Sequence, residues 1–115
     1  MICLALESTA HTFGCGIVSD ANGKCNILAN EKSAYTTQKG GIHPKEAMEH
    51  HLQNAKNVIE NALQKANIDW KDIDLISFSQ GPGLGPCLSV GAIAARALSL
   101  KYKKPRSAKR GELRP

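Results

Sequence analysis

The sequence has 115 residues, of which 42% are hydrophobic and 22% charged, and its formal net charge is +5 at pH 7. This length suits one compact domain with its own core, and the composition is that of an ordinary soluble globular protein. No run is long and apolar enough to cross a bilayer, which excludes a membrane-spanning chain. The N-terminal segment has neither a basic leader nor a small-residue cleavage pattern, so we expect a cytoplasmic protein without a secretory signal.

The four cysteines stand at positions 3, 15, 25 and 87. None lies two to four residues from another, which argues against a zinc motif. Three of them fall in apolar or strand-like runs, where a free cysteine behaves as a small hydrophobic residue. We therefore expect free thiols.

The first third of the chain predicts an antiparallel meander of three strands. Residues 2–7 (ICLALE), 13–20 (FGCGIVSD) and 25–35 (CNILANEKSAY) have the composition of strands. Small hydroxylated residues separate the first two strands, and Asn22-Gly23 favours the positive φ angles of a hairpin turn before the third.

A long amphipathic helix is predicted over residues 45–67, with Pro44 suited to its first turn. Its apolar stripe recurs at three- and four-residue steps: Ala47, His51, Ala55, Val58, Ala62, Leu63 and Ala66. After a polar turn, residues 74–80 predict a buried strand and residues 87–102 a second helix. A meander followed by a parallel crossover indicates an α/β layer structure.

The loop between the last strand and the last helix, residues 81–86, holds three glycines and two prolines. Two interpretations are open. Glycines let a ligand approach the backbone, and a helix N-terminus attracts phosphates. Alternatively, the small residues at positions 91, 92, 94 and 95 serve tight packing of the helix. The loop is no Walker A motif, because no Gly-Lys-Ser/Thr follows, and GPGLGP does not match GxGxxG.

Three segments in order carry a specific resemblance: MICLALESTAHT, GGIHPKEAMEHH, and SQGPGLGPCLSVGAIAARALSL followed by KYKKP. They resemble the N-terminal lobe of the universal tRNA threonylcarbamoyladenosine-synthesis family. Its archaeal and eukaryotic members are the catalytic subunit of the KEOPS complex, formerly described as O-sialoglycoprotein endopeptidases. The resemblance implies an actin/Hsp70-like (ribonuclease H-like) half-domain with the order β-β-β-α-β-α. It also implies transfer of a threonylcarbamoyl group from its adenylate to N6 of adenosine 37 in tRNA.

The resemblance also implies where substrate lies, because in such folds the turn between the first two strands faces the phosphates. Four residues of this turn are candidates: Glu7, Ser8, Thr9 and His11. The loop glycines are candidates as well: Gly81, Gly83 and Gly85. Three histidines are expected near the active cleft: His43, His50 and His51. The residues alone favour a solvated strand-end acid for Glu7 and a surface turn histidine for His11. The histidine spacings do not suit a metal pair on one helix.

The chain departs from the family in two places. The family usually has glycine where Ser8 stands, and a positive φ there would strain the turn. After KKP the family continues with a hydrophobic strand and an HxxxH motif that supplies two metal ligands, whereas this chain reads RSAKRGELRP. We therefore expect a lobe of residues 1–105, truncated before the fifth strand, and a basic tail of residues 106–115 outside the family. We expect no metal in this chain, although the full-length family uses iron or zinc and binds nucleotide or threonylcarbamoyl-adenylate.

Two functions follow as expectations. The first is an enzyme lobe that is inactive alone. The second is an assembly module that docks the small dimerising KEOPS subunit, contacts the kinase subunit, or self-associates through helices or an open sheet edge. The basic tail suits weak, salt-sensitive tRNA contact, while aromatic residues at 4% indicate no stacking motif. An endopeptidase is disfavoured, because no HExxH motif and no nucleophile with an evident histidine base occurs.

Overall fold

The first three strands form the predicted antiparallel meander in the computed structural model, which describes residues 1–37 and 40–110. They are β1 (Ile2–Glu7), β2 (Thr12–Ser19) and β3 (Asn26–Ala34). The turn between β2 and β3 has φ angles of 62° at Asn22 and 70° at Gly23. Both angles confirm the hairpin prediction, since these residue types tolerate left-handed backbone.

Helix α1 (Pro44–Ala66) is the predicted amphipathic helix. It ends where Asn67 adopts the left-handed conformation at φ 55° and donates its backbone N–H to Gln64 and Leu63. Most of its predicted stripe is buried, and Ile59 is buried in addition. A short 3-10 turn (Trp70–Asp72) then leads into β4 (Leu75–Gly81), and α2 (Gly85–Tyr102) follows.

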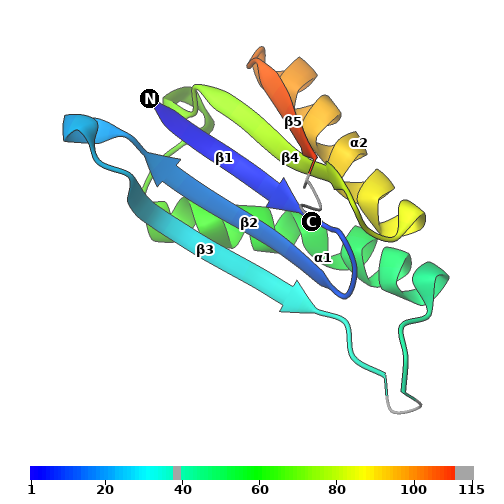
Figure 1. Cartoon of the computed structure of the whole chain (residues 1–115). Helices are drawn as coiled ribbons and strands as arrows, with labels where there is room; N and C mark the ends of the chain where they lie inside the picture. The colour runs from blue at the N-terminus through cyan, green and yellow to red at the C-terminus, as the bar shows by residue number, and fades with distance from the viewer. Residues whose placement is uncertain (38–39, 111–115) are drawn as a thin grey trace, which may run out of the picture.

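The sheet has the order β3-β2-β1-β4-β5, and β4 lies parallel to β1 (Figure 1). The expectation of truncation before a fifth strand is wrong, because β5 (Arg106–Arg110) pairs in parallel with β4. Pairing begins where the Ile76 N–H donates to the Pro105 carbonyl at 2.9 Å. This strand carried no hydrophobic signal because the side chains of residues 106–108 are exposed. Its backbone completes the edge of β4.

Both helices lie on one face of the sheet, where they pack against each other and cover the core (Figure 1). Alternate strand residues point into this core, including Leu4, Leu6, Phe13, Ile17 and Ile76. No element of the described residues covers the opposite face (Figure 1), and the side chains on it include the small or polar residues Ala5, Ser77 and Ser79. The lack of a second layer there leaves the intervening strand residues only half-buried.

The four cysteines are free thiols, with Cys15 and Cys87 buried, Cys3 half-buried and Cys25 exposed. Neither described helix has the length and apolarity needed to span a membrane.

Candidate functional site

The candidate site lies where β1 and β4 end side by side, with Leu6 paired to Phe78 in parallel register. The β1–β2 loop (residues 8–11) and the β4–α2 loop (residues 82–84) meet at this point. Backbone contact joins them, because the Leu84 N–H donates to the Thr9 carbonyl at 2.7 Å. In open α/β sheets, the carboxyl ends of parallel strands are where ligands bind.

Ser8 ties the β1–β2 loop to α2. Its side chain is buried, and its hydroxyl accepts a hydrogen bond of 3.0 Å from the Gly91 N–H. A Cβ atom on residue 91 would lie only 2.6 Å from the Ser8 Oγ atom. Ser8 does not have a positive φ, so the strain considered for a serine at this position is absent. Its hydroxyl instead holds the β1–β2 loop to α2 through the hydrogen bond from Gly91.

Gly83 permits the close approach of the two loops. A Cβ atom at this position would lie 2.9 Å from the Thr9 Cα atom and closer still to the Thr9 carbonyl oxygen. Gly91 thus allows close packing, as the packing interpretation predicted, and Gly83 does so in addition. Gly85, the first residue of α2, is exposed and faces open space, while Gly81 is buried at the end of β4.

Glu7 is half-buried at the end of β1, and its carboxylate is oriented by the loop. Its Oε1 atom accepts the Thr9 backbone N–H at 2.6 Å and also the Thr9 hydroxyl. Its Oε2 atom lies beside Gly14 of β2, where a Cβ atom on the glycine would be 3.9 Å from it. A carboxylate held in this way can accept a hydrogen bond from a substrate hydroxyl or amine.

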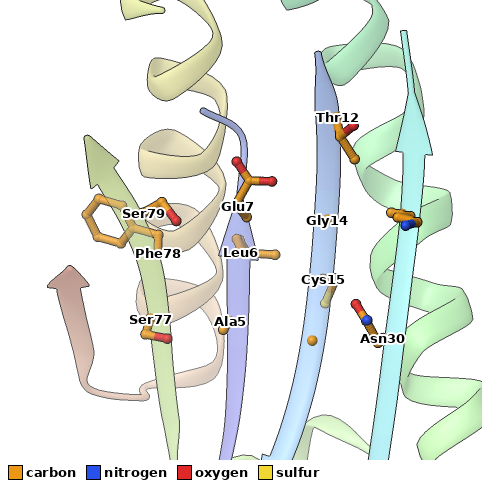
Figure 2. A pocket seen from close by; sticks show the side chains of 12 residues that line it. Ala5, Leu6, Glu7, Thr12, Gly14, Cys15, Asn30, Ser77, Phe78 and Ser79 are labelled. Atoms are coloured by element: carbon orange, nitrogen blue, oxygen red, sulfur yellow. The ribbon is translucent and has the colours of Figure 1, made fainter. Parts of the chain in front are cut away.

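Glu7 borders an open hollow of about 480 Å³ on the helix-free face of the sheet. Figure 2 views this face, with the helices behind the strands and the Glu7 carboxylate at the end of β1. Polar side chains from four strands line the hollow: Glu7, Thr12, Asn30, Lys32, Ser77 and Ser79. Small residues of β1 and β2 form its floor, so the backbone itself is accessible to a ligand.

Of the candidate histidines on α1, His51 contacts the β1–β2 loop, and His50 contacts His51 and β3. His51 is fully buried, and its Nε2 atom lies 2.7 Å from the Ala10 carbonyl oxygen. The Nδ1 atoms of His50 and His51 are 3.0 Å apart, and the His50 Nε2 atom lies 3.1 Å from the Ser33 hydroxyl. Burial, and then the neighbouring His51, lower the pKa of His50 below its ordinary value.

The other two candidate histidines are exposed and stand apart from this contact. His43 is the N-cap of α1 and makes no side-chain cap hydrogen bond. The His11 Nδ1 atom lies 3.5 Å from the Thr12 hydroxyl, at the limit of hydrogen bonding. His11 contributes to the loop through its backbone, because its carbonyl accepts the Tyr35 N–H at 2.6 Å.

The iron or zinc that the resemblance implies for the full-length family does not fit the donors present here. Over residues 1–37 and 40–110, no group of three or more His, Cys, Asp and Glu side chains could hold a metal ion. The sequence also contains no HxxxH motif. We therefore assign no step of any reaction in this chain to a metal.

Sequence reasoning named Glu7 but missed the other residues that line the hollow and the partners of the histidines. Ser77 and Ser79 alternate along β4, and Gly14 and Gly16 alternate along β2. This two-residue period of small residues was the available signal for an uncovered face. The sequence around Ser33 gave no sign of its role, because its partner His50 lies on a different element, α1, whereas Ser33 lies on β3.

Comparison with known proteins decides the family. The family model described as TsaD, tRNA N6-adenosine threonylcarbamoyltransferase, matches residues 26–108. The chain belongs to this family.

Curated members of the tRNA N6-adenosine threonylcarbamoyltransferase family agree with this assignment. The Thermococcus gammatolerans and Thermococcus sibiricus proteins of that name are 56% and 55% identical to this chain over 105 residues. Each match covers 91% of this chain but 31% of the relative. The chain thus spans about a third of the length of these relatives.

Solved structures with low sequence identity confirm the actin/Hsp70-like, ribonuclease H-like fold. YeaZ from Pseudomonas aeruginosa superposes with a TM-score of 0.71 at 16% identity, covering 95% of this chain and 42% of YeaZ. RuvC from Thermus thermophilus, solved with a Holliday junction substrate, gives a TM-score of 0.55 at 14% identity, covering 96% of this chain and 64% of RuvC. These likenesses extend to the fold alone.

Proposed function

We propose that this chain is the N-terminal lobe of a tRNA N6-adenosine threonylcarbamoyltransferase and is inactive alone. Its membership of the family supports the reaction class. The relatives are about three times as long, so a complete enzyme of their kind has further polypeptide beyond the part that this chain matches. We place the protein in the cytoplasm with its tRNA substrate.

The observation that carries this proposal is the meeting of the β1–β2 and β4–α2 loops at the carboxyl ends of two parallel strands. The N-terminus of α2 adjoins this meeting point and offers a positive dipole end and the backbone N–H groups of Gly85 and Cys87, while the Leu84 N–H donates to Thr9. We assign the phosphate of a nucleotide or threonylcarbamoyl-adenylate to this place. Glu7 is assigned to a hydroxyl or amine of the same ligand, because its carboxylate would repel the phosphate itself.

The test is a titration of the ¹⁵N-labelled chain with a non-hydrolysable analogue of threonylcarbamoyl-adenylate. Amide shifts are expected at residues 8–11 and 83–85, and none at the distant Asn22-Gly23 turn. Thr9→Val should weaken binding, because it removes the hydroxyl that orients Glu7, and Thr36→Val at an exposed position is the control. No shift at a saturating concentration would refute the nucleotide site. Transfer to tRNA by this chain alone would refute its inactivity.

A second candidate function, partner docking without chemistry, is favoured by exposed apolar side chains on the helices. Ile93 and Leu100 of α2 are 66% and 69% exposed and lie two turns apart on one side of the helix. Leu52 of the neighbouring α1 is 58% exposed. Large exposed apolar side chains on adjoining helices suit a protein partner. The partners proposed are the small dimerising KEOPS subunit, the kinase subunit, or a second copy of the chain.

Light scattering after size-exclusion chromatography tests this docking function, with the chain alone and mixed with each subunit. Ile93→Lys should abolish a complex formed through α2. Ile27→Lys is the matched control, because Ile27 is 74% exposed on β3. A complex that survives Ile93→Lys and Leu100→Lys would exclude this helix face as the interface. Binding of a partner without any binding of nucleotide would favour the assembly module.

We also propose weak, salt-sensitive contact with tRNA at the basic C-terminal end. Residues 106–110 of the expected tail form β5, and residues 111–115 lie outside the described residues. Trp70 and Tyr102 stack near this end with ring centroids 4.4 Å apart, a pair that sequence reasoning missed. Trp70 is the sole tryptophan, so tRNA should quench its fluorescence, and added salt should reverse the effect. Tight binding that resists salt would contradict this proposal.

A further inference from the structure

A continuous line of polar contacts runs from β3 through α1 to the β1–β2 loop. It joins the Ser33 hydroxyl, the two rings of His50 and His51, and the carbonyl of Ala10, with separations of 3.1, 3.0 and 2.7 Å. Every separation is within hydrogen-bond range. The line ends at Ala10 of the β1–β2 loop, to which the proposed function assigns a ligand. Its other members lie on β3 and α1, far from this loop in the sequence.

The direction of these hydrogen bonds follows from the Ala10 end. A carbonyl oxygen accepts only, so the His51 Nε2 atom must carry a proton and donate it. In a neutral ring the His51 Nδ1 atom is then an acceptor, and the His50 Nδ1 atom must donate to it. The His50 Nε2 atom is left as an acceptor for the Ser33 hydroxyl. With both rings neutral, one arrangement of protons satisfies the whole line.

The surroundings of the two rings favour this neutral arrangement. His51 is fully buried, and the Phe13 ring of β2 lies with its centroid 6.0 Å away. The Tyr35 ring lies 6.1 Å from the His50 ring, and its hydroxyl donates to Glu46 at 2.5 Å. Burial disfavours the ionised form of His50. Two protonated rings would also direct two N–H groups at each other across 3.0 Å.

We propose that His51 is a positioning residue, held by His50 and Ser33 as the neutral Nε2–H tautomer, which fixes the β1–β2 loop through the Ala10 carbonyl. The tautomers and the loop attachment follow from the contacts alone. The consequence for a bound ligand rests on the proposed function, because that function assigns the ligand to this loop. His51 acts through Ala10 and touches no substrate.

The first experiment reads the tautomers from long-range ¹H–¹⁵N correlations of the imidazole nitrogens in the intact chain. With the rings neutral, His51 should be the Nε2–H tautomer and His50 the Nδ1–H tautomer. The latter is the less common form in free histidine, so its presence is diagnostic. The exposed His11 and His43 serve as internal references. Detection of His51 as the Nδ1–H tautomer, or of His50 as the Nε2–H tautomer, would overturn the proposal.

The second experiment measures amide hydrogen exchange at Leu84 and Gly91, whose N–H groups donate to the β1–β2 loop. His51→Phe should speed this exchange about tenfold relative to the amides of β1, because it leaves the Ala10 carbonyl without a donor. His51→Gln should restore protection, since its amide can donate in place of the ring N–H. His43→Phe at the exposed N-cap is the control and should change nothing.

Normalisation to β1 separates positioning from a general loss of stability. Equal acceleration at β1, Leu84 and Gly91 would show a merely structural role and overturn the proposal. So would a His51→Gln variant no better protected than His51→Phe. If His51→Phe does not fold, the tautomers of the unmodified chain and the exchange of His51→Gln decide the matter. Neither readout requires a ligand, so the proposed function can fail while this assignment stands.

Discussion

The Ser8 hydroxyl and the Gly91 amide form a hydrogen bond of 3.0 Å between residues 83 positions apart. Both residues are buried, and a Cβ atom on residue 91 would approach the Ser8 Oγ atom to 2.6 Å. A serine at position 8 therefore requires a glycine at position 91.

We expect Gly91→Ala to lower the free energy of unfolding by about 2 to 3 kcal/mol, because the new methyl group overpacks against the Ser8 hydroxyl. Ser8→Gly should cost about 1 kcal/mol through the lost hydrogen bond. The double variant should be more stable than Gly91→Ala alone, since the glycine makes room for the methyl group. Urea denaturation followed by circular dichroism measures all three. Strictly additive costs would contradict the coupling.

Gly83→Ala and Gly85→Ala test the packing of the two loops as a matched pair. At residue 83 a methyl group would meet the Thr9 backbone, and we expect a loss of about 2 to 3 kcal/mol. At residue 85 it would meet open space, so the change should stay within about 0.5 kcal/mol. Thermal and urea unfolding report both values. Equal effects at the two positions would mean that Thr9 and Gly83 are not in contact in solution.

Stability should fall as the pH drops through about 6.5, because burial holds the pKa of His50 below that ordinary value. The folded state thus keeps His50 neutral while the unfolded state binds a proton. The unfolded state binds more protons in this range, so the free energy of unfolding rises with pH. The contribution of His50 to the free energy of unfolding is fully present above pH 6.5. It declines as the pH falls towards the folded-state pKa of His50.

Urea denaturation at a series of pH values measures this dependence. Between the unfolded-state and folded-state pKa of His50, His50→Gln should reduce the slope of the free energy of unfolding against pH. His43→Gln at an exposed position should leave this slope unchanged. The same slope in His50→Gln and in the unmodified chain would assign the dependence to other groups.

The four thiols should differ sharply in reactivity. Burial raises the pKa of Cys15 to about 12, with Glu31 adding to the effect, and burial also raises the pKa of Cys87. Because the thiolate is the nucleophile, iodoacetamide at neutral pH should label the exposed Cys25 first and spare Cys15. Peptide mass spectrometry gives the order, and labelling in denaturant is the control. Cys15 labelled as fast as Cys25 in the folded chain would contradict the burial.

Most of the fold was predictable because its elements carry local signals. Strand-like composition marked β1 and β2, the turn residues Asn22-Gly23 marked the hairpin, and the spaced stripe marked α1. β5 was not predictable, since its described side chains are exposed and supply no hydrophobic pattern. β5 forms because its backbone pairs with the edge of β4, and that edge is defined only by the assembled sheet.

The candidate site was predictable in part. Sequence reasoning named Ser8, Gly83 and His51, and noted Gly91 among the small residues of the second helix. It had no means to pair Ser8 with Gly91 or His51 with Ala10, because those contacts span 83 and 41 positions. Spacing along α1 could exclude a metal pair on that helix, but the partners of its histidines come from β3 and the β1–β2 loop.

The place of β1 in the sheet also has a consequence for synthesis. β1 leaves the ribosome before β4 and is the central strand of the five-stranded sheet, with β4 as its parallel neighbour. At roughly 5 to 20 residues per second, β4 emerges several seconds after β1. Through that interval the β1 edge awaiting β4 is open in the nascent chain. The growing polypeptide therefore faces a greater hazard of aggregation than the released protein, and a chaperone that shields this edge would act during translation.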